Sequence, residues 1–106
     1  ILSAALVNTP PIGSAVYVAN KAYLEELTKV WAVENLKFNI TSNAVSPSLM
    51  LTNLTASMDE RLIEQIKNDR PLLSTEEVAE SVLFLVNAGQ QINGVNLIIN
   101  AAGNIK

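Results

Sequence analysis

The residues best suited to chemistry in this sequence are a tyrosine and a lysine four positions apart, Tyr17 and Lys21. In a helix this spacing puts both side chains on one face, a turn apart. A phenol is a poor base at neutral pH, but a nearby ammonium group favours the phenolate. Such a pair can donate a proton to a carbonyl oxygen or take one from an alcohol. Because a tyrosine at a helix start can also serve packing alone, the surrounding segments must decide between these interpretations.

Other classes of site lack the residues they need. The sequence has no cysteine and no histidine, which removes disulfides, thiolate chemistry, the commonest general base and the commonest metal ligand. A hydrolase built on Ser3 would therefore have no histidine to activate its hydroxyl. The net charge is −3, and no basic cluster indicates nucleic acid or an anionic membrane as a partner. No apolar run reaches the roughly 20 residues of a membrane helix, so we expect a cytoplasmic protein.

The composition is typical of one folded domain. Of the 106 residues, 49% are hydrophobic and 16% are charged, which suits a modest aliphatic core. The first seven residues are apolar and begin without a methionine or a basic leader. We therefore expect the chain to start within a strand, as a fragment of a longer protein.

The elements that must position Tyr17 and Lys21 follow from hydrophobic periodicity and turn residues. An apolar strand over residues 1–7 is followed by a loop over 8–14 that contains Pro10, Pro11 and Gly13. Residues 15–36 form a long helix whose apolar residues extend beyond one stripe, so we expect it to be covered on more than one side. On its polar face, Glu25 and Lys29 are spaced as a favourable pair.

The second half of the chain continues the alternation of strands and helices. We expect a strand over 38–45 ended by Ser46-Pro47-Ser48, an irregular stretch over 49–57, and a charged helix over 58–68. Ser74 and Glu77 form a capping box that starts a helix to about Asn87. That helix should bury Val78, Val82, Leu85 and Val86, and residues 94–100 form the last strand.

This order predicts an α/β fold with a parallel sheet and right-handed crossovers. In such sheets ligands bind at the carboxyl ends of the strands. Three polar or turn residues lie near those ends, namely Ser3, Pro47 and Asn100.

Several segments, taken in order, resemble the second half of the short-chain dehydrogenase/reductase family. They are Tyr17-Val18-Ala19-Asn20-Lys21-Ala22, Asn43-Ala44-Val45-Ser46-Pro47-Ser48 with Thr52 beyond it, Thr75-Glu76-Glu77-Val78-Ala79-Glu80, and Gly94-Val95-Asn96-Leu97-Ile98-Ile99-Asn100. The resemblance covers essentially the whole chain. It implies the C-terminal portion of a Rossmann-like, doubly wound parallel sheet, with about three strands and flanking helices.

The resemblance also implies roles for individual residues. Tyr17 would be the general acid/base, Lys21 would hydrogen-bond the nicotinamide ribose, and Ser3 would hydrogen-bond the substrate oxygen. The cofactor would be NAD or NADP, and the substrate a small carbonyl compound or secondary alcohol. Besides Tyr17 and Lys21, the residues implied to contact the cofactor are Pro47, Ser48, Met50 and Thr52.

The sequence departs from the family pattern at three places. The family's serine stands thirteen residues before the tyrosine, where this chain has Ala4, and Ser3 is one residue further away. Ser14 is the other candidate, although a helix cap explains it better. Ser48 replaces the usual glycine after the proline, and Asn100-Ala101-Ala102 stands where Asp-Gly-Gly is common.

The largest departure is an absence, because the family's glycine-rich phosphate turn would precede Ile1. We therefore interpret residues 1–106 as one domain segment that lacks the dinucleotide-binding half and that alone binds dinucleotide weakly or not at all. The alternative is a non-catalytic α/β module that associates through its long apolar helix. Either way, an open strand edge and that helix predict a homo-oligomer, a dimer or a tetramer.

Overall fold

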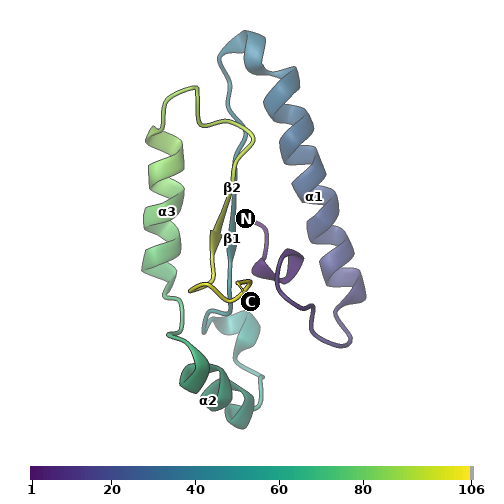
Figure 1. The fold of residues 1–106 in the computed structure, drawn as a ribbon, viewed down its shortest axis with the longest axis vertical. Helices are drawn as coiled ribbons and strands as arrows, with labels where there is room; N and C mark the ends of the chain where they lie inside the picture. Colours follow the sequence, from purple (N-terminus) through teal and green to yellow (C-terminus); the bar gives the residue numbers. More distant parts are fainter. Residues whose placement is uncertain (106) are drawn as a thin grey trace.

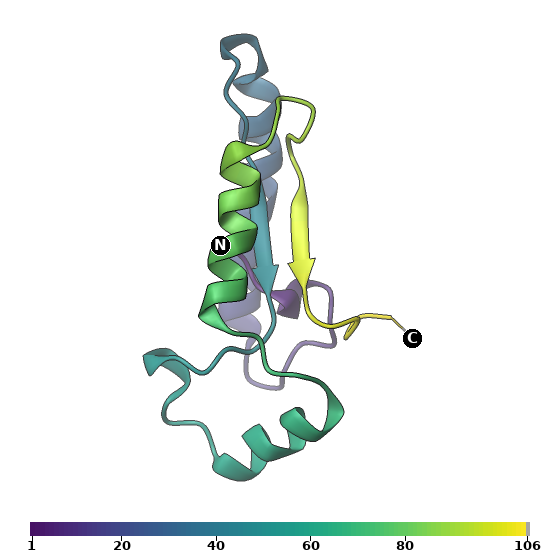
Figure 2. The same cartoon turned by 90° about the vertical axis from the view of Figure 1, so that its left-hand side faces the viewer.

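The computed structural model describes residues 1–105, in which two parallel strands lie between two helices. The strands β1 (Ala44–Pro47) and β2 (Asn96–Ile99) run through the middle of Figure 1, between α1 (Ala15–Glu34) and α3 (Thr75–Asn87). In the perpendicular view of Figure 2, α3 lies in front of the strands and α1 behind them. The helices therefore cover opposite faces of the sheet, and the predicted α/β fold class is confirmed.

The sheet has two strands, with Ala44 opposite Asn96 and Pro47 opposite Ile99, and the third strand expected over residues 1–7 is not formed. One backbone hydrogen bond does join this segment to β1: the Leu2 N–H donates to the Val45 carbonyl at 2.7 Å. The chain then turns into a short 3-10 helix, η1 (Ala4–Leu6). At its start the Ser3 hydroxyl oxygen accepts a hydrogen bond from an N–H of the turn, which offers the backbone a local alternative to the ladder.

Strand β1 begins later than the sequence predicts. The chain leaves α1 through a second 3-10 helix, η2 (Leu36–Phe38), and Asn39 takes the left-handed conformation with φ of 60°, which asparagine tolerates. The Asn43 side chain then donates to the Ile92 carbonyl and accepts from the Val95 N–H, both at 2.9 Å. These side-chain bonds hold the segment before β1 to the loop before β2 without a strand.

Strand β1 also ends later, because it runs through the Ser46-Pro47 pair that we expected to break it. The Ala44 N–H donates to the Val95 carbonyl, just before β2, and the Ser48 N–H donates to the Ile99 carbonyl at the end of β2, both at 2.8 Å. Since successive residues of a strand face opposite edges, the Pro47 nitrogen points away from β2. The N–H that proline lacks is therefore not needed for pairing with β2.

The two helices expected in the second half are present, and each is capped at its start. Helix α2 (Glu60–Asp69) starts at Asp59, whose carboxylate accepts the Arg61 N–H at 2.8 Å. Helix α3 starts at the capping box, in which the Ser74 Oγ accepts the Glu77 N–H at 3.1 Å and the Glu77 carboxylate accepts the Ser74 N–H at 2.8 Å. Hydrogen bonds from the Ser74 backbone and then from its side chain lower the pKa of Glu77.

The core lies between the sheet and α3. Val45 of β1 is buried against Val78 and Leu85 of α3. Around them pack the partly buried side chains of Met50, Leu73, Val82, Ile92, Leu97 and Ile99. Val86 was expected in this core but is 73% exposed, because it borders an open hollow between α3 and residues 41–45.

Helix α1 is apolar on more sides than this chain covers. Only Ala32 of its twenty residues is buried. Its large exposed apolar residues are Val16, Tyr17, Tyr23, Leu24, Val30, Trp31 and Val33. The expected cover on a second side is therefore not supplied by residues 1–105. Within the same residues, every helix is too short or too polar to cross a membrane.

Candidate active site

One cavity of about 690 Å³ collects the candidate residues that the sequence singled out. Its volume lies in the range typical of small-molecule sites. It opens beyond Pro47, at the carboxyl end of β1, which is where parallel α/β sheets bind ligands. The residues of the sequence analysis that line it are Ser3, Tyr17, Lys21, Pro47, Ser48, Met50 and Thr52.

Helix α1 presents Tyr17 and Lys21 to this cavity from its first two turns. The Lys21 Nζ lies 5.8 Å from the centroid of the Tyr17 ring and donates to the Ile1 carbonyl at 3.0 Å. Tyr17 is 47% exposed, so its ring remains accessible to a ligand. The pair therefore has the arrangement expected from its spacing: a phenol beside an ammonium group, both facing open space.

The two candidate serines differ in what their hydroxyl groups do. The Ser3 Oγ accepts the Ala5 N–H at 3.2 Å, so its own proton can be donated to a ligand. The Ser14 Oγ instead donates to the Pro11 carbonyl at 2.6 Å. Ser14 stands at the N-cap position of α1 but makes no capping bond with its side chain, which corrects the role expected for it. Both serines line the cavity, and Ser3 has the hydroxyl better suited to a substrate oxygen.

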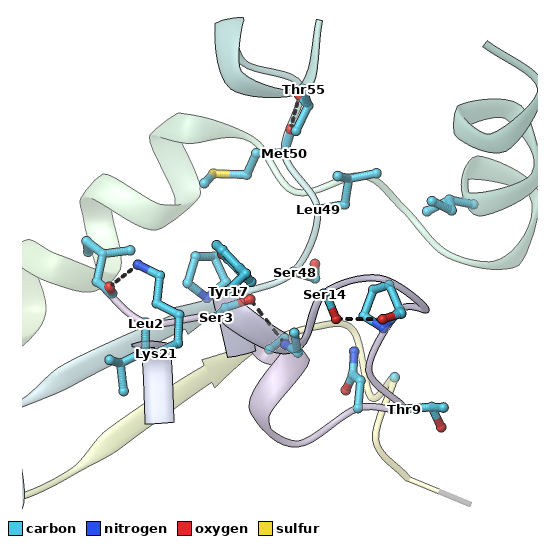
Figure 3. Close-up of a pocket in the computed structure, with 18 of the residues that line it drawn as sticks. Leu2, Ser3, Thr9, Ser14, Tyr17, Lys21, Ser48, Leu49, Met50 and Thr55 are labelled. Atoms are coloured by element: carbon cyan, nitrogen blue, oxygen red, sulfur yellow. Dashed lines mark hydrogen bonds between the residues drawn. The ribbon is translucent and has the colours of Figure 1, made fainter. Parts of the chain in front are cut away.

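The loop after β1 closes the cavity from the other side. In Figure 3, Leu49, Met50 and Thr55 border the cavity from this loop, whereas Ser3, Tyr17 and Lys21 border it from the first part of the chain. The Thr55 Oγ1 lies 2.8 Å from the Met50 carbonyl and accepts the Thr52 N–H at 2.9 Å. These bonds shape the turn at η3 (Asn53–Thr55). Thr55 had no signal in the sequence, because its contacts with Met50 and Thr52 form only in this turn.

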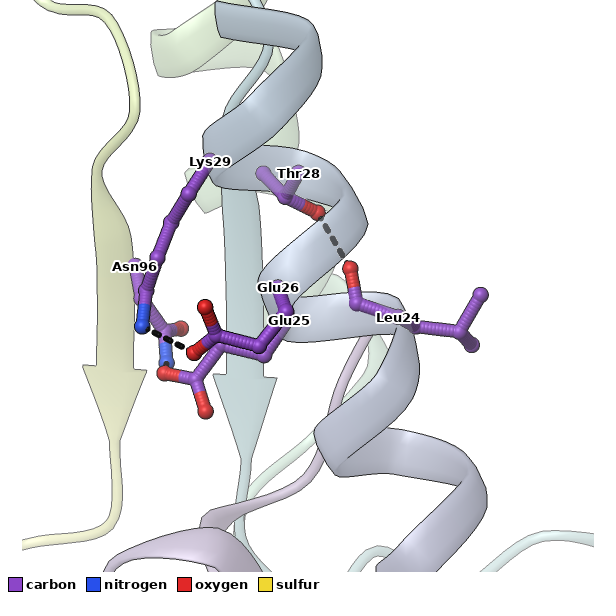
Figure 4. Close-up of polar contacts among 6 residues, drawn as sticks. All are labelled: Leu24, Glu25, Glu26, Thr28, Lys29 and Asn96. Atoms are coloured by element: carbon purple, nitrogen blue, oxygen red, sulfur yellow. Dashed lines mark hydrogen bonds and ion pairs between the residues drawn. The ribbon is translucent and has the colours of Figure 1, made fainter.

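Polar contacts hold α1 against the sheet and so position the tyrosine. The Asn96 Nδ2 of β2 donates to the Glu25 Oε1 at 3.3 Å, and the Asn96 Oδ1 accepts from the Ser46 Oγ at 2.7 Å. Figure 4 shows Glu25 turned toward Asn96, while Lys29 reaches Glu26. Lys29 therefore forms its ion pair with Glu26 rather than with Glu25, although the nearby Glu25 charge also acts on Lys29. The hydrogen bond that Lys29 donates to the Glu26 carboxylate raises the pKa of Lys29.

The chain after β2 forms part of the cavity rim. Asn100 is buried and donates to the Asn8 Oδ1 at 3.0 Å and to the Asn104 Oδ1 at 2.8 Å. Asn8 lines the cavity and Asn100 does not, so Asn100 contacts the cavity only through its hydrogen bond to Asn8. Ala101 and Ala102 follow with φ of 49° and 62°, in the left-handed region that favours glycine. The family's glycines are thus replaced by residues under backbone strain.

Two further lining residues, Arg70 and Gly103, had no signal in the sequence. Arg70 ends α2, and Gly103 follows the strained turn after β2. With Lys21, Arg70 makes the cavity wall cationic, since the lining includes no aspartate or glutamate. In the part of the chain that the structure describes, no cluster of three or more acidic, histidine or cysteine side chains could hold a metal ion.

Comparison with known proteins assigns the family. A family model described as enoyl-(acyl carrier protein) reductase matches residues 3–101. A short-chain dehydrogenase/reductase of Aspergillus oryzae is 33% identical over 108 residues, which cover 94% of this chain and 41% of that protein. The chain belongs to the short-chain dehydrogenase/reductase family. The resemblance seen in the ordered segments is therefore confirmed.

Other members give the same picture of the fold and of the length. An NAD-dependent glycerol dehydrogenase of Listeria innocua is 38% identical over 96 residues, covering 85% of this short-chain dehydrogenase/reductase chain and 37% of the relative. The solved structure of a 4-hydroxyisoleucine dehydrogenase complexed with NADH superposes with a TM-score of 0.86 at 27% identity, covering 99% of this chain and 45% of the other. The chain thus spans about two fifths of the length of the curated relatives that it matches.

Proposed function

We propose that this chain carries the proton-transfer end of the active site of an NAD(P)-dependent oxidoreductase that interconverts a carbonyl and a secondary alcohol. The observation that carries the proposal is the shared cavity, in which Ser3 and the pair of Tyr17 and Lys21 face the loop after β1. The cofactors of similar proteins support it, since one relative is an NAD-dependent glycerol dehydrogenase and one similar structure was solved with NADH. A cytoplasmic location stays a prediction.

In the proposed reaction Tyr17 handles the proton. During reduction its hydroxyl gives a proton to the carbonyl oxygen, and during oxidation its phenolate takes the proton of the alcohol. Lys21 places a positive charge beside the Tyr17 ring and orients a bound ribose through its remaining N–H groups. Ser3 donates its hydroxyl proton to the same substrate oxygen. When a nicotinamide dinucleotide is bound, it supplies the hydride to the carbonyl carbon or accepts it from the alcohol carbon.

The residues present fit one end of such a cofactor. A phenol and an ammonium group open to the cavity suit a nicotinamide ribose, and Pro47, Ser48, Met50 and Thr52 would border the nicotinamide. The sequence contains no glycine-rich turn before a helix, which is the usual site of the pyrophosphate. We therefore propose that the chain is the C-terminal segment of a Rossmann domain whose other half binds the remainder. Its share of the relatives' length supports this.

Kinetics of the full-length protein test the function. We expect reduction of small ketones or aldehydes with NADH or NADPH, and Tyr17→Phe should lower kcat by roughly 10²- to 10⁴-fold because it removes the transferable proton. Tyr23→Phe is the matched control, since Tyr23 lies on α1 outside the cavity and is 66% exposed. A Tyr17→Phe enzyme that keeps wild-type kcat would refute the assignment. Calorimetry of residues 1–106 alone with NADPH should show no micromolar binding.

A second candidate, a module that associates through α1, is favoured by one observation. Val16, Tyr23, Val30 and Val33 leave α1 with a long apolar surface in solvent, and such surfaces commonly mark interfaces. We infer a homo-oligomer, a dimer or a tetramer, in either case. Light scattering at micromolar concentration should give more than the monomer mass, and Val30→Glu should reduce it. A monomer in that experiment would contradict the interface, whereas a full-length protein that turns over no carbonyl or alcohol substrate would favour the non-catalytic module.

A further inference from the structure

The cavity has a second cation that the proposed proton transfer does not use. Arg70, at the end of α2, is half-buried and lines the cavity together with Ile66 and Gly103. The ion pairs among residues 1–105 join Lys29 to Glu26 and Lys67 to Glu64, so neither involves this guanidinium. A half-buried cation without an acidic partner gains from a bound anion, because part of its hydration has already been removed.

Gly103 makes room for this guanidinium. A Cβ atom at position 103 would lie 1.7 Å from the Arg70 Nη1 and 2.9 Å from the Arg70 Cζ. It would also lie 3.0 Å from the Asn100 carbonyl oxygen, a contact so tight that this oxygen would have to shift by a few tenths of an ångström. The arginine side chain therefore occupies space that any residue other than glycine would fill. The loop after β2 and the end of α2, far apart in the sequence, therefore meet at the Arg70 guanidinium on the cavity wall.

We propose that Arg70 binds an oxyanion of the substrate, a carboxylate or a phosphate, and so selects carbonyl substrates that carry a negative charge. A guanidinium is a planar fork of N–H donors that matches both groups in bidentate geometry. The cavity is also lined by Leu49, Met50 and Ile66, whose apolar side chains suit the carbon skeleton between a carbonyl and an acid group. The proposal rests on the proposed function, because it requires Tyr17 to act on the carbonyl of the same molecule.

The test compares three substrates that share one reacting ketone. The full-length protein is assayed with acetoacetate, acetoacetyl-CoA and the uncharged methyl acetoacetate, using the nicotinamide cofactor that it accepts. Arg70→Met should lower kcat/KM roughly 10- to 100-fold for a charged substrate, mainly through KM, and change the ester less than 3-fold. A loss confined to acetoacetate identifies a carboxylate as the ligand, and a loss confined to acetoacetyl-CoA identifies a phosphate. Arg70→Lys should lower kcat/KM for the charged substrate less than Arg70→Met does, because lysine keeps the charge but lacks the fork of N–H donors.

A second variant leaves the arginine in place. Gly103→Ala should displace the Arg70 guanidinium and produce the same selective loss on the charged substrate. Gly89→Ala is its matched control, because a Cβ atom at Gly89 would meet nothing within 4 Å. Gly89→Ala should leave kcat/KM unchanged for all three substrates.

Three results would overturn the proposal. They are equal losses on the ester and the charged substrates, unchanged kcat/KM for both charged substrates, and a Kd for NADH or NADPH raised by Arg70→Met, which would assign Arg70 to the dinucleotide. If none of the three ketones turns over, calorimetry with acetoacetate and acetoacetyl-CoA replaces kinetics. Binding that Arg70→Met abolishes supports the anion site, and no binding to the wild-type protein refutes it. Failure of the proposed function shows separately, as a Tyr17→Phe variant with unchanged kcat.

Discussion

The Lys21 ammonium group lies 5.8 Å from the centroid of the Tyr17 ring and donates a hydrogen bond to the Ile1 carbonyl at 3.0 Å. One lysine therefore joins the helix that carries the tyrosine to the segment that leads into Ser3. The helical turn places the ammonium beside the phenol, whereas the bond to Ile1 connects residues 20 positions apart. Because of this double contact, the loss of Lys21 should lower both the rate of proton transfer and the stability of the fold, but to different extents.

Lys21→Met should impair catalysis far more than stability. In the full-length protein we expect kcat to fall roughly 100-fold or more, because the positive charge beside the Tyr17 ring is lost. The lost hydrogen bond to Ile1 should lower the free energy of unfolding by about 1–2 kcal/mol. Lys29→Met, on the same helix but paired with Glu26 outside the cavity, should keep kcat near wild type. Equal effects of the two variants on kcat would contradict the role of Lys21.

Ser3→Ala and Ser14→Ala should differ in their effect on turnover. The Ser3 hydroxyl can donate its proton to a substrate oxygen, whereas the Ser14 proton is held by the Pro11 carbonyl at 2.6 Å. Ser3→Ala should therefore reduce kcat/KM by roughly 10- to 100-fold, the loss expected for one hydrogen bond to a developing charge. Ser14→Ala should mainly affect thermal stability. The reverse order of kcat/KM would mean that Ser14 is the catalytic serine.

Ala102→Gly should stabilise the protein. Ala102 has φ of 62°, where an L-residue costs about 1–2 kcal/mol, and glycine adopts this region without that cost. After the larger chain entropy of glycine is subtracted, we expect a gain of about 0.5–1 kcal/mol in a urea titration. Ala79→Gly is the control, because this exposed position inside α3 should lose about 1 kcal/mol. If both glycines destabilise the protein, the strain assigned to the turn after β2 is absent.

Glu77→Gln should change the pH dependence of stability. Hydrogen bonds from Ser74 lower the pKa of Glu77 in the folded chain, so the folded state binds this proton less readily than the unfolded state. The contribution is therefore fully present above the unfolded pKa and is lost as the pH falls through the folded pKa. The Tm of the wild type should exceed that of Glu77→Gln at pH 7, and the gap should narrow toward pH 3. An equal Tm gap at pH 7 and at pH 3 would contradict this contribution of Glu77.

Elements with local signals were predicted well. Helix α1 is the best example, because its apolar periodicity and the Pro/Gly loop before it depend only on neighbouring residues. The capping box of Ser74 and Glu77 forms as expected because its two bonds span three residues. Strands were predicted less well, since a strand needs a partner elsewhere in the chain. Residues 1–7 lack a full ladder, and β1 is set by where β2 pairs with it.

The missed residues of the site depend on an irregular turn or on contacts between distant segments. Thr55 acts through a turn that brings its hydroxyl to Met50, and Asn96 takes the carboxylate of Glu25 that we had paired with Lys29. Arg70 and Gly103 meet only because α2 ends beside the chain that leaves β2. The two alanines after Asn100 were recognised as a departure from glycine, and their left-handed backbone supplies the physical reason for the family's choice.

The sequence by itself determined the α/β order, the helical register that sets Tyr17 beside Lys21, and the family to which these segments belong. The order and the register depend on hydrogen bonds and side-chain periodicity within a few residues, and the family is recognised from short segments that follow one another in a fixed order. Only the tertiary structure decided that seven candidate residues line one cavity and that Ser3 rather than Ser14 keeps a proton to donate. It alone brought a second cation, Arg70, to the same wall. Those outcomes depend on chain crossings and packing between distant segments, which no local pattern encodes.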